Sequence, residues 1–216
     1  MGITSRNVTG SRGDTGEADP AVTAALEAWG RGTAGEPEVL TALSGTRLIV
    51  PVVTMLTERG DDGSEKETEM ALPTLVGQDG RAAVIAFTGT ETLSRWNPEA
   101  RPVPFGASQV WEYAQAEGNA VVIDVAGPVS LAVEGARLAA LAAGAEPPRP
   151  HEDPDVRAEI ATIARDFTVE PGPDGSDFLV TLRGLGEAGA RQAAGEIAAR
   201  VRAGGRFRRG VAFRLS

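Results

Sequence analysis

The sequence predicts an α+β protein: a first domain with a mixed or antiparallel sheet and helices, and a smaller α-β-β-α-β second domain. Three observations support this. Runs rich in β-branched residues, which favour strands, alternate irregularly with Ala- and Leu-rich stretches typical of helices. Asp79-Gly80 separates two such runs, as in a β-hairpin with a type I′ turn. Four prolines between Glu146 and Pro154 break both patterns and indicate a stiff linker.

Local signals define the elements of the first domain, predicted over residues 18–144. Asp19-Pro20 is a helix start, because Asp caps the first turn and Pro fits the first helical position. Pro51 implies a bulge or an edge position in its strand. The expected order is helix 20–30, a helix from residue 37, strand 46–56, a charged loop 58–69, strands 69–77 and 81–87, helix 90–96, a proline-rich loop 97–106, helix 107–117, strand 120–125 and helix 134–143.

The second domain is predicted over residues 155–216, after an exposed linker at 145–154. A step in charge supports this division: residues 1–150 carry 20 acidic and 11 basic side chains, whereas residues 151–216 carry 10 of each. We expect a small antiparallel sheet covered by helices on one face. The expected order is helix 155–166, strands 167–170 and 177–183, helix 187–203 and strand 210–215. Residues 1–17 have little to bury and are expected to be disordered.

Composition limits the possible functions. The chain has no Cys, which excludes disulfides, thiolate metal sites and thiol nucleophiles. No apolar run reaches the about 20 residues of a membrane helix, and the first residues lack the apolar segment of a signal peptide. We therefore expect a cytoplasmic protein with no membrane contact. The net charge of −9 disfavours binding to nucleic acid. No cofactor or metal site is expected.

One glycine motif suggests nucleotide binding. Gly184, Gly186 and Gly189 match the dinucleotide-binding pattern between an expected strand and an expected helix. No acidic residue follows to bind a ribose, however, and too little chain remains for a parallel sheet. We interpret the motif as a turn, and we keep a small-ligand or nucleotide-binding protein that uses Gly184–Gly189 as the alternative function. Gly186→Ala is expected to destabilise the fold if Gly186 has a positive φ.

Other candidate residues have ordinary structural interpretations. His151, the only histidine, is expected to be a solvent-exposed linker residue, which leaves no histidine for a catalytic triad. The acidic run Asp61–Glu65 lacks the spacing of a calcium loop. A hydrolase using Asp124 and Glu134 is a third, weaker hypothesis. The remaining basic cluster is interpreted as a charged strand edge rather than a phosphate or RNA contact: Arg206, Arg208, Arg209 and Arg214.

Aromatic and proline residues in the middle of the chain are the candidate protein-contact site. Large rings beside a loop often form binding sites in proteins. Such rings are scarce here, since aromatic residues make up 5% of the chain. The predicted contact residues are Trp96, Pro102, Pro104, Phe105 and Trp111.

The middle of the chain resembles a known family. An ordered series of segments carries the resemblance: EMALPTLVGQDGRAAVIAFTGTETLSRW, PEARPVPF, QVWEYAQAEG, AVVIDVAGP and VSLAVEGARLAALAAG. Residues 69–143 thereby resemble the N-terminal domain of the SseB family, named after the enhanced serine sensitivity protein. The family more often carries Asn and Pro after the strand that here ends in VIDVAGP.

The resemblance implies no catalytic residue that could be transferred to this chain. Together with the composition, it predicts a non-enzymatic binding or regulatory protein. We expect it to act through contacts with a protein partner, whose identity the sequence leaves open together with the oligomeric state.

Overall fold

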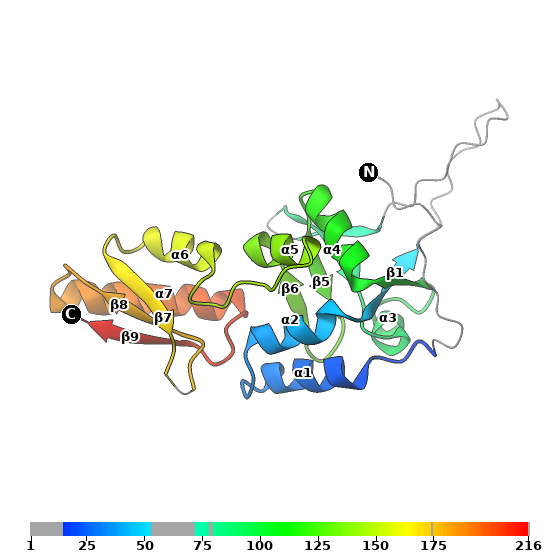
Figure 1. Cartoon of the computed structure of the whole chain (residues 1–216), viewed down its shortest axis with the longest axis horizontal. Coiled ribbons are helices and arrows are strands. Elements are labelled where there is room, and N and C mark those ends of the chain that lie inside the picture. Colours follow the sequence, from blue (N-terminus) through cyan, green and yellow to red (C-terminus); the bar gives the residue numbers. More distant parts are fainter. Residues whose placement is uncertain (1–14, 53–71, 78–79, 174, 216) are drawn as a thin grey trace, which may run out of the picture. The chain divides into compact units, whose positions relative to one another are not determined.

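The computed structural model describes residues 15–52, 72–77, 80–173 and 175–215 (Figure 1). It confirms the predicted α+β class, with seven helices and nine strands in the described residues. By its internal contacts the chain divides into two compact units, each built from two separate stretches. Unit 1 comprises Met1–Asp19 and Gly45–Val133, and unit 2 comprises Pro20–Ser44 and Glu134–Ser216.

In the part of unit 1 that the structure describes, a backbone bridge between two residues links a two-stranded sheet to a four-stranded one. A two-stranded antiparallel sheet pairs β1 (Arg47–Val52) with β4 (Arg101–Gly106). Ile49 of β1 and Phe87 exchange backbone hydrogen bonds of 2.8 Å, which link this sheet to the end of β3. The second sheet has the order β2-β3-β5-β6, with β3 and β5 parallel and the outer strands antiparallel: β2 (Thr74–Val76), β3 (Ala82–Ala86), β5 (Ala120–Ile123) and β6 (Leu131–Val133).

The helices of unit 1 follow their apolar spacing. α4 (Ala107–Ala116) buries Val110, Trp111 and Ala114, which recur at the three- and four-residue intervals of one helix face. The shorter α3 (Thr90–Trp96) buries Leu93 against Ile49, Ile85 and Phe87.

The predicted hairpin is confirmed. β2 and β3 pair in antiparallel register from Thr74↔Val84 to Val76↔Ala82. Gly80 has a φ of +78°, a conformation that glycine adopts without steric cost. The amide of Gly80 donates to the carbonyl of Gly77, so Gly80 is the fourth residue of this turn. The predicted type I′ turn, in which Gly80 would be a central residue, is therefore corrected. Asp79 lies outside the described residues.

The predicted loop 97–106 is wrong in its second half, where the structure has strand β4. Proline lacks the N–H that a sheet ladder uses, and three prolines therefore suggested a loop. The register explains how two of them fit. Pro104 stands opposite Ile49, whose own N–H and C=O point to Phe87 on the other side of β1. Pro104, and Pro102 two residues before it, therefore occupy positions where no ladder hydrogen bond is made.

Unit 2 contains a three-stranded sheet with the predicted α-β-β-α-β order (Figure 1). β8 pairs antiparallel with β7 but parallel with β9, so the expected antiparallel sheet is corrected to a mixed one. The reason is α7, which carries the chain back so that β9 runs in the direction of β8. The elements are α1 (Pro20–Gly30), α2 (Glu36–Ser44), α5 (Gly135–Ala142), α6 (Pro154–Ala161), β7 (Phe167–Pro171), β8 (Phe178–Leu182), α7 (Glu187–Gly204) and β9 (Val211–Leu215).

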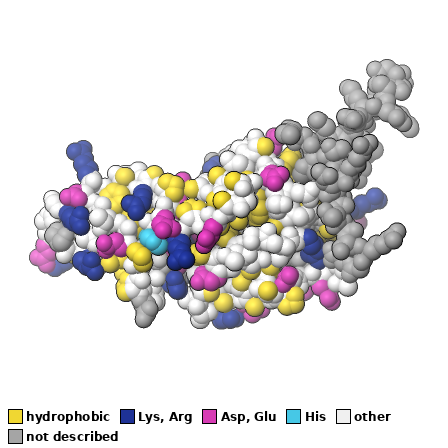
Figure 2. Space-filling model, in the orientation of Figure 1, with side chains coloured by type: hydrophobic (Ala, Val, Ile, Leu, Met, Phe, Trp, Pro, Cys, Tyr) yellow, Lys and Arg dark blue, Asp and Glu magenta, His cyan; other side chains and the backbone are white. Residues whose placement is uncertain are grey.

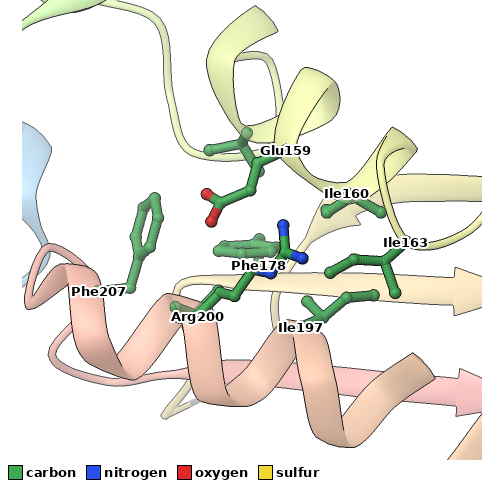
Figure 3. A pocket seen from close by; sticks show the side chains of 9 residues that line it. Glu159, Ile160, Ile163, Phe178, Ile197, Arg200 and Phe207 are labelled. Carbon is green, nitrogen blue, oxygen red and sulfur yellow. The ribbon is translucent and has the colours of Figure 1, made fainter. Parts of the chain in front are cut away.

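The helices α6 and α7 cover one face of this sheet. Their apolar residues join a single core cluster with alternate residues of β8, namely Phe178, Val180 and Leu182. A cavity of about 10 Å³ remains above Phe178, with Glu159 of α6 and Arg200 of α7 beside it (Figure 3). Such a space holds about one water molecule, so it is a packing defect of the core and not a ligand site.

Two segments, one predicted to be a stiff exposed linker and the other a disordered N-terminus, are held by contacts where the structure describes them. The proline-rich segment 145–154 is anchored by Asp153, which is 0% exposed and pairs with Arg206, 53 residues further on. The proline content of this segment predicts that it is stiff, but it does not predict the ion pair with a residue far along the chain. At the N-terminus the carbonyl of Gly16 accepts the amide of Thr90, and that of Glu17 accepts the Arg47 guanidinium, so residues 15–17 are held. Residues 1–14 and the charged loop 58–69 lie outside the described residues.

The two compact units differ from the predicted domains 18–144 and 155–216. Helices α1 and α2 belong to unit 2 with the C-terminal elements, although they begin the first predicted domain. Independent folding of the predicted domains stays a prediction. Within the described part of the chain, no helix is both long and apolar enough to cross a membrane.

Candidate functional site

A network of four charged side chains organises unit 2, and three of them are buried while Arg206 is half-buried. Glu36, at the start of α2, forms ion pairs with Arg137 of α5 and with Arg206. Arg206 also pairs with Asp153, the residue that caps α6 by accepting the amide of Asp155. Burial lowers the pKa of Arg137, and the neighbouring Glu36 opposes that effect. Two acids and two bases balance, so the network joins three helices and the turn after α7 without leaving net buried charge.

A polar cleft of about 550 Å³ opens in unit 2 beside this network. Its volume lies within the usual range for ligand pockets. One wall is α2, another is the segment that ends at Asp153, and a third is the β7–β8 hairpin together with Arg209. The lining residues are Pro37, Glu38, Thr41, Glu146, Arg149, Pro150, His151, Pro171, Gly172, Ser176, Asp177 and Arg209.

The cleft walls are fixed by local bonds. The carbonyl of Arg149 accepts the amides of Glu152 and Asp153, which closes a turn in front of α6. In the hairpin, a Cβ added to Gly172 would lie 2.6 Å from Ser176 Oγ and 2.8 Å from its carbonyl oxygen, so only glycine allows this approach. These contacts place the walls before any ligand binds.

Asp177 connects the hairpin wall to the turn before β9. Its Oδ2 accepts the amides of Arg209 and Gly210 at 2.9 and 3.0 Å, and its Oδ1 lies 3.3 Å from Arg209 Nε. Burial raises the pKa of Asp177, while the hydrogen bonds from Arg209 act in the opposite direction. The carboxylate therefore holds Arg209 at the edge of the cleft.

Charges of both signs face the cleft. Glu38, Glu146 and Asp177 are acidic and Arg149 and Arg209 are basic, which gives a formal charge of −1 with His151 neutral. Basic and acidic side chains lie close around the histidine on the face shown in Figure 2. The side chain of His151 is only 19% exposed, and its Nε2 lies 3.7 Å from Glu152 Oε1. The expectation of a solvent-exposed linker histidine is therefore corrected.

The arginine cluster near the C-terminus is mostly engaged within the protein. Arg206 belongs to the network of four charged side chains, Arg209 pairs with Asp177, and Arg214 pairs with Glu170 across the sheet at 3.5 Å. The Arg208 guanidinium lies 4.7 Å over the ring of Trp29, a cation–π contact. Arg206, Arg208 and Arg209 precede β9 and only Arg214 lies on it, so the interpretation of the cluster as a charged strand edge is corrected for these three residues.

The glycine motif forms the turn between β8 and α7. Gly184 has a φ of +68°, and Gly186 is the N-cap of α7 with a φ of −59°. Gly186 therefore lacks the positive φ on which its predicted sensitivity to alanine depended. Residues 183–189 are exposed and line none of the cavities described above.

The predicted protein-contact residues divide between core and surface. Phe105 and Trp111 are each 1% exposed, so they lie beneath the surface of unit 1. Trp96 is half-buried against Phe87, with ring centres 5.7 Å apart. Pro102 is exposed and Pro104 half-buried on β4. A surface role is therefore confined to Trp96, Pro102 and Pro104.

Asp124, one of the two carboxylates weighed as catalytic, is buried at the end of β5. It accepts hydrogen bonds from the amide and hydroxyl of Thr88, at 2.9 and 2.7 Å, and from the hydroxyl of Thr92 at 2.6 Å. Its φ of +51° is unusual for a residue other than glycine, although Asp tolerates it better than most. Asp124 thus joins the ends of β3 and β5 to the start of α3.

Comparison with protein-family models gives one match. Residues 22–140 match the model described as the SseB protein N-terminal domain. This is more than half of the 216 residues. The chain belongs to the SseB family. The SseB match confirms the resemblance noted over 69–143 and extends it towards the N-terminus, into α1. No curated protein and no solved structure matches the chain.

The SseB match does not contain most of the cleft. Of the lining residues, Pro37, Glu38 and Thr41 lie within the matched region, and the other nine follow it. Sequence reasoning missed the cleft because its residues come from separated segments, none of which carries a binding motif. His151 was the one available signal, and its proline-rich surroundings led to the wrong expectation.

Proposed function

We propose that the protein is a non-enzymatic binding protein that holds a basic segment of a partner protein in the cleft of unit 2. The cleft itself is the observation that supports this proposal. It is large, it is open enough to have charged residues on its rim, and hydrogen bonds fix its walls before binding. A preformed site loses less conformational entropy on binding than a flexible one, which favours affinity.

Charge indicates the kind of segment. Glu38 and Glu146 are exposed and oppose a single exposed arginine, Arg149, because Arg209 is engaged by Asp177. The whole chain carries a net charge of −9, which attracts basic partners over longer distances. A segment with Lys or Arg facing the two glutamates fits both observations. The cytoplasm is the compartment we propose for this binding.

Selection from a library of random peptides on the purified full-length chain tests the proposal. Peptides rich in Lys and Arg should be enriched, and their affinity should fall with added salt. In the double variant Glu38→Gln/Glu146→Gln, the dissociation constant of an enriched peptide should rise about tenfold, since each exposed ion pair contributes up to about 1 kcal/mol.

Glu112→Gln is the matched control, because it removes an equal charge from an exposed position on α4 of unit 1. It should leave peptide affinity unchanged. Failure to enrich any peptide, or equal affinity for the double variant and the wild type, would overturn the proposal.

A further inference from the structure

A second pocket in unit 2 has a different chemistry. It has a volume of about 360 Å³ and lies between the last turns of α7 and the start of β9. Arg202, Arg208 and Arg209 line it, and none of its lining residues is acidic. It also has an apolar wall, formed by Ala198, Val201, Phe207 and Val211. We call it the arginine pocket.

Two of the three guanidinium groups are positioned by the protein. Arg208 stacks over Trp29, and Arg209 is held through its Nε by Asp177. Arg202 is exposed on the last turn of α7. Positioned guanidinium groups suit phosphate, because their planar N–H donors bind two of its oxygens at once.

The charge in the pocket matches a phosphate monoester. Three arginines contribute three positive charges, and Asp177 offsets one of them. The carboxyl end of α7 contributes about half a negative charge, which leaves about +1.5. A phosphate monoester carries about −1.5 to −2 at neutral pH. A carboxylate or a sulfate ester, with one negative charge, would leave part of the positive charge unbalanced.

We propose that the arginine pocket binds a small organic phosphate monoester, with the phosphate on Arg202, Arg208 and Arg209 and the organic part against the apolar wall. The pocket exceeds what an inorganic phosphate ion fills, so a ring or a short carbon chain has room beside the apolar wall. This proposal does not depend on peptide binding in the cleft, although Arg209 borders both spaces.

Calorimetric titration of the full-length chain with phenyl phosphate, phenyl sulfate and inorganic phosphate tests the proposal. Phenyl phosphate should bind saturably. Its affinity should exceed that of phenyl sulfate, which has the same shape and less charge, and that of inorganic phosphate, which lacks the ring. Equal affinity for phenyl sulfate would contradict the phosphate assignment, and equal affinity for inorganic phosphate would contradict the role of the apolar wall.

Arg202→Gln locates the site, since Arg202 is exposed and its replacement leaves the core intact. It should weaken phenyl phosphate binding about tenfold, the loss expected for one charge-assisted contact. Arg208→Gln should give a similar loss. Arg191→Gln, on the first turns of the same helix, should have no effect. Absence of saturable binding, or unchanged affinity in both pocket variants, would overturn the proposal.

Discussion

Arg206 illustrates how much one side chain can organise in this protein. Its guanidinium pairs with Glu36 and Asp153, and it also lies 4.5 Å over the ring of Phe207. Its carbonyl accepts the indole N–H of Trp29 at 3.0 Å. Through these contacts a single residue after α7 holds α1, α2 and the start of α6.

We expect Arg206→Met to lower the free energy of unfolding by about 3–5 kcal/mol, because it leaves two buried carboxylates with too few partners. Arg214→Met is the matched control. Arg214 also pairs with a glutamate, but its side chain is 62% exposed, and exposed pairs contribute about 0–1 kcal/mol. The free energy of unfolding of both variants can be measured by urea denaturation. Equal losses for the two would show that burial of the network does not matter.

The turn into α7 shows why a sequence motif must be resolved into its separate residues. Gly184 has the left-handed conformation that other residues adopt at a cost, whereas Gly186 has a φ that any residue can adopt. A Cβ added to either would meet no atom within 4 Å. The effects of replacing Gly184 and Gly186 by alanine should therefore differ only because their backbone conformations differ.

Gly184→Ala should destabilise the protein by about 1–2 kcal/mol, the cost of a left-handed conformation for alanine. Gly186→Ala should change the stability by less than about 0.5 kcal/mol, because a small entropic gain opposes a poorer N-cap. Thermal unfolding of both variants tests this pair. The idea would be wrong if Gly186→Ala were the more damaging change.

Elements with strong local signals could be predicted from the sequence, and those that depend on pairing could not. Pro20 and the apolar spacing up to Trp29 define α1 without reference to the rest of the chain. β4 was missed because its prolines are acceptable only opposite residues that bond elsewhere, and the sequence does not show that register. The cleft was missed because it also depends on which distant residues come together. Glu38 and Arg209 line the same cleft only in the folded chain.

At the scale of the whole molecule, the units combine segments that are distant in the sequence. Glu36 lies 170 residues from Arg206 and 101 residues from Arg137, yet it contacts both. The apolar cluster on β8, by contrast, lies entirely within residues 156–213. The charge step and the prolines suggested a boundary at 145–154. Both are local features of composition, whereas the two units are defined by contacts between residues that are far apart in the sequence.

The separate fragments 18–144 and 155–216 should both be less stable than the full chain. The first leaves Glu36 and Arg137 without Arg206 and Asp153, and the second loses the α6 cap, a loss of about 1 kcal/mol, together with Trp29. Circular dichroism during heating compares the three proteins. Fragments that unfold cooperatively at the temperature of the full chain would instead support the two domains predicted from the sequence.

The distance between Glu36 and its partners also has a consequence during synthesis on the ribosome. At about 5–20 residues per second, the 170 residues from Glu36 to Arg206 take about 10–30 seconds to translate. Through that interval the Glu36 carboxylate has only solvent or Arg137 to pair with, so α1 and α2 cannot complete their packing. Helices α1 and α2 are therefore synthesised early, but their packing is completed only after Arg206 has been added. A nascent chain stalled before Arg206 would expose these incompletely packed helices to chaperones.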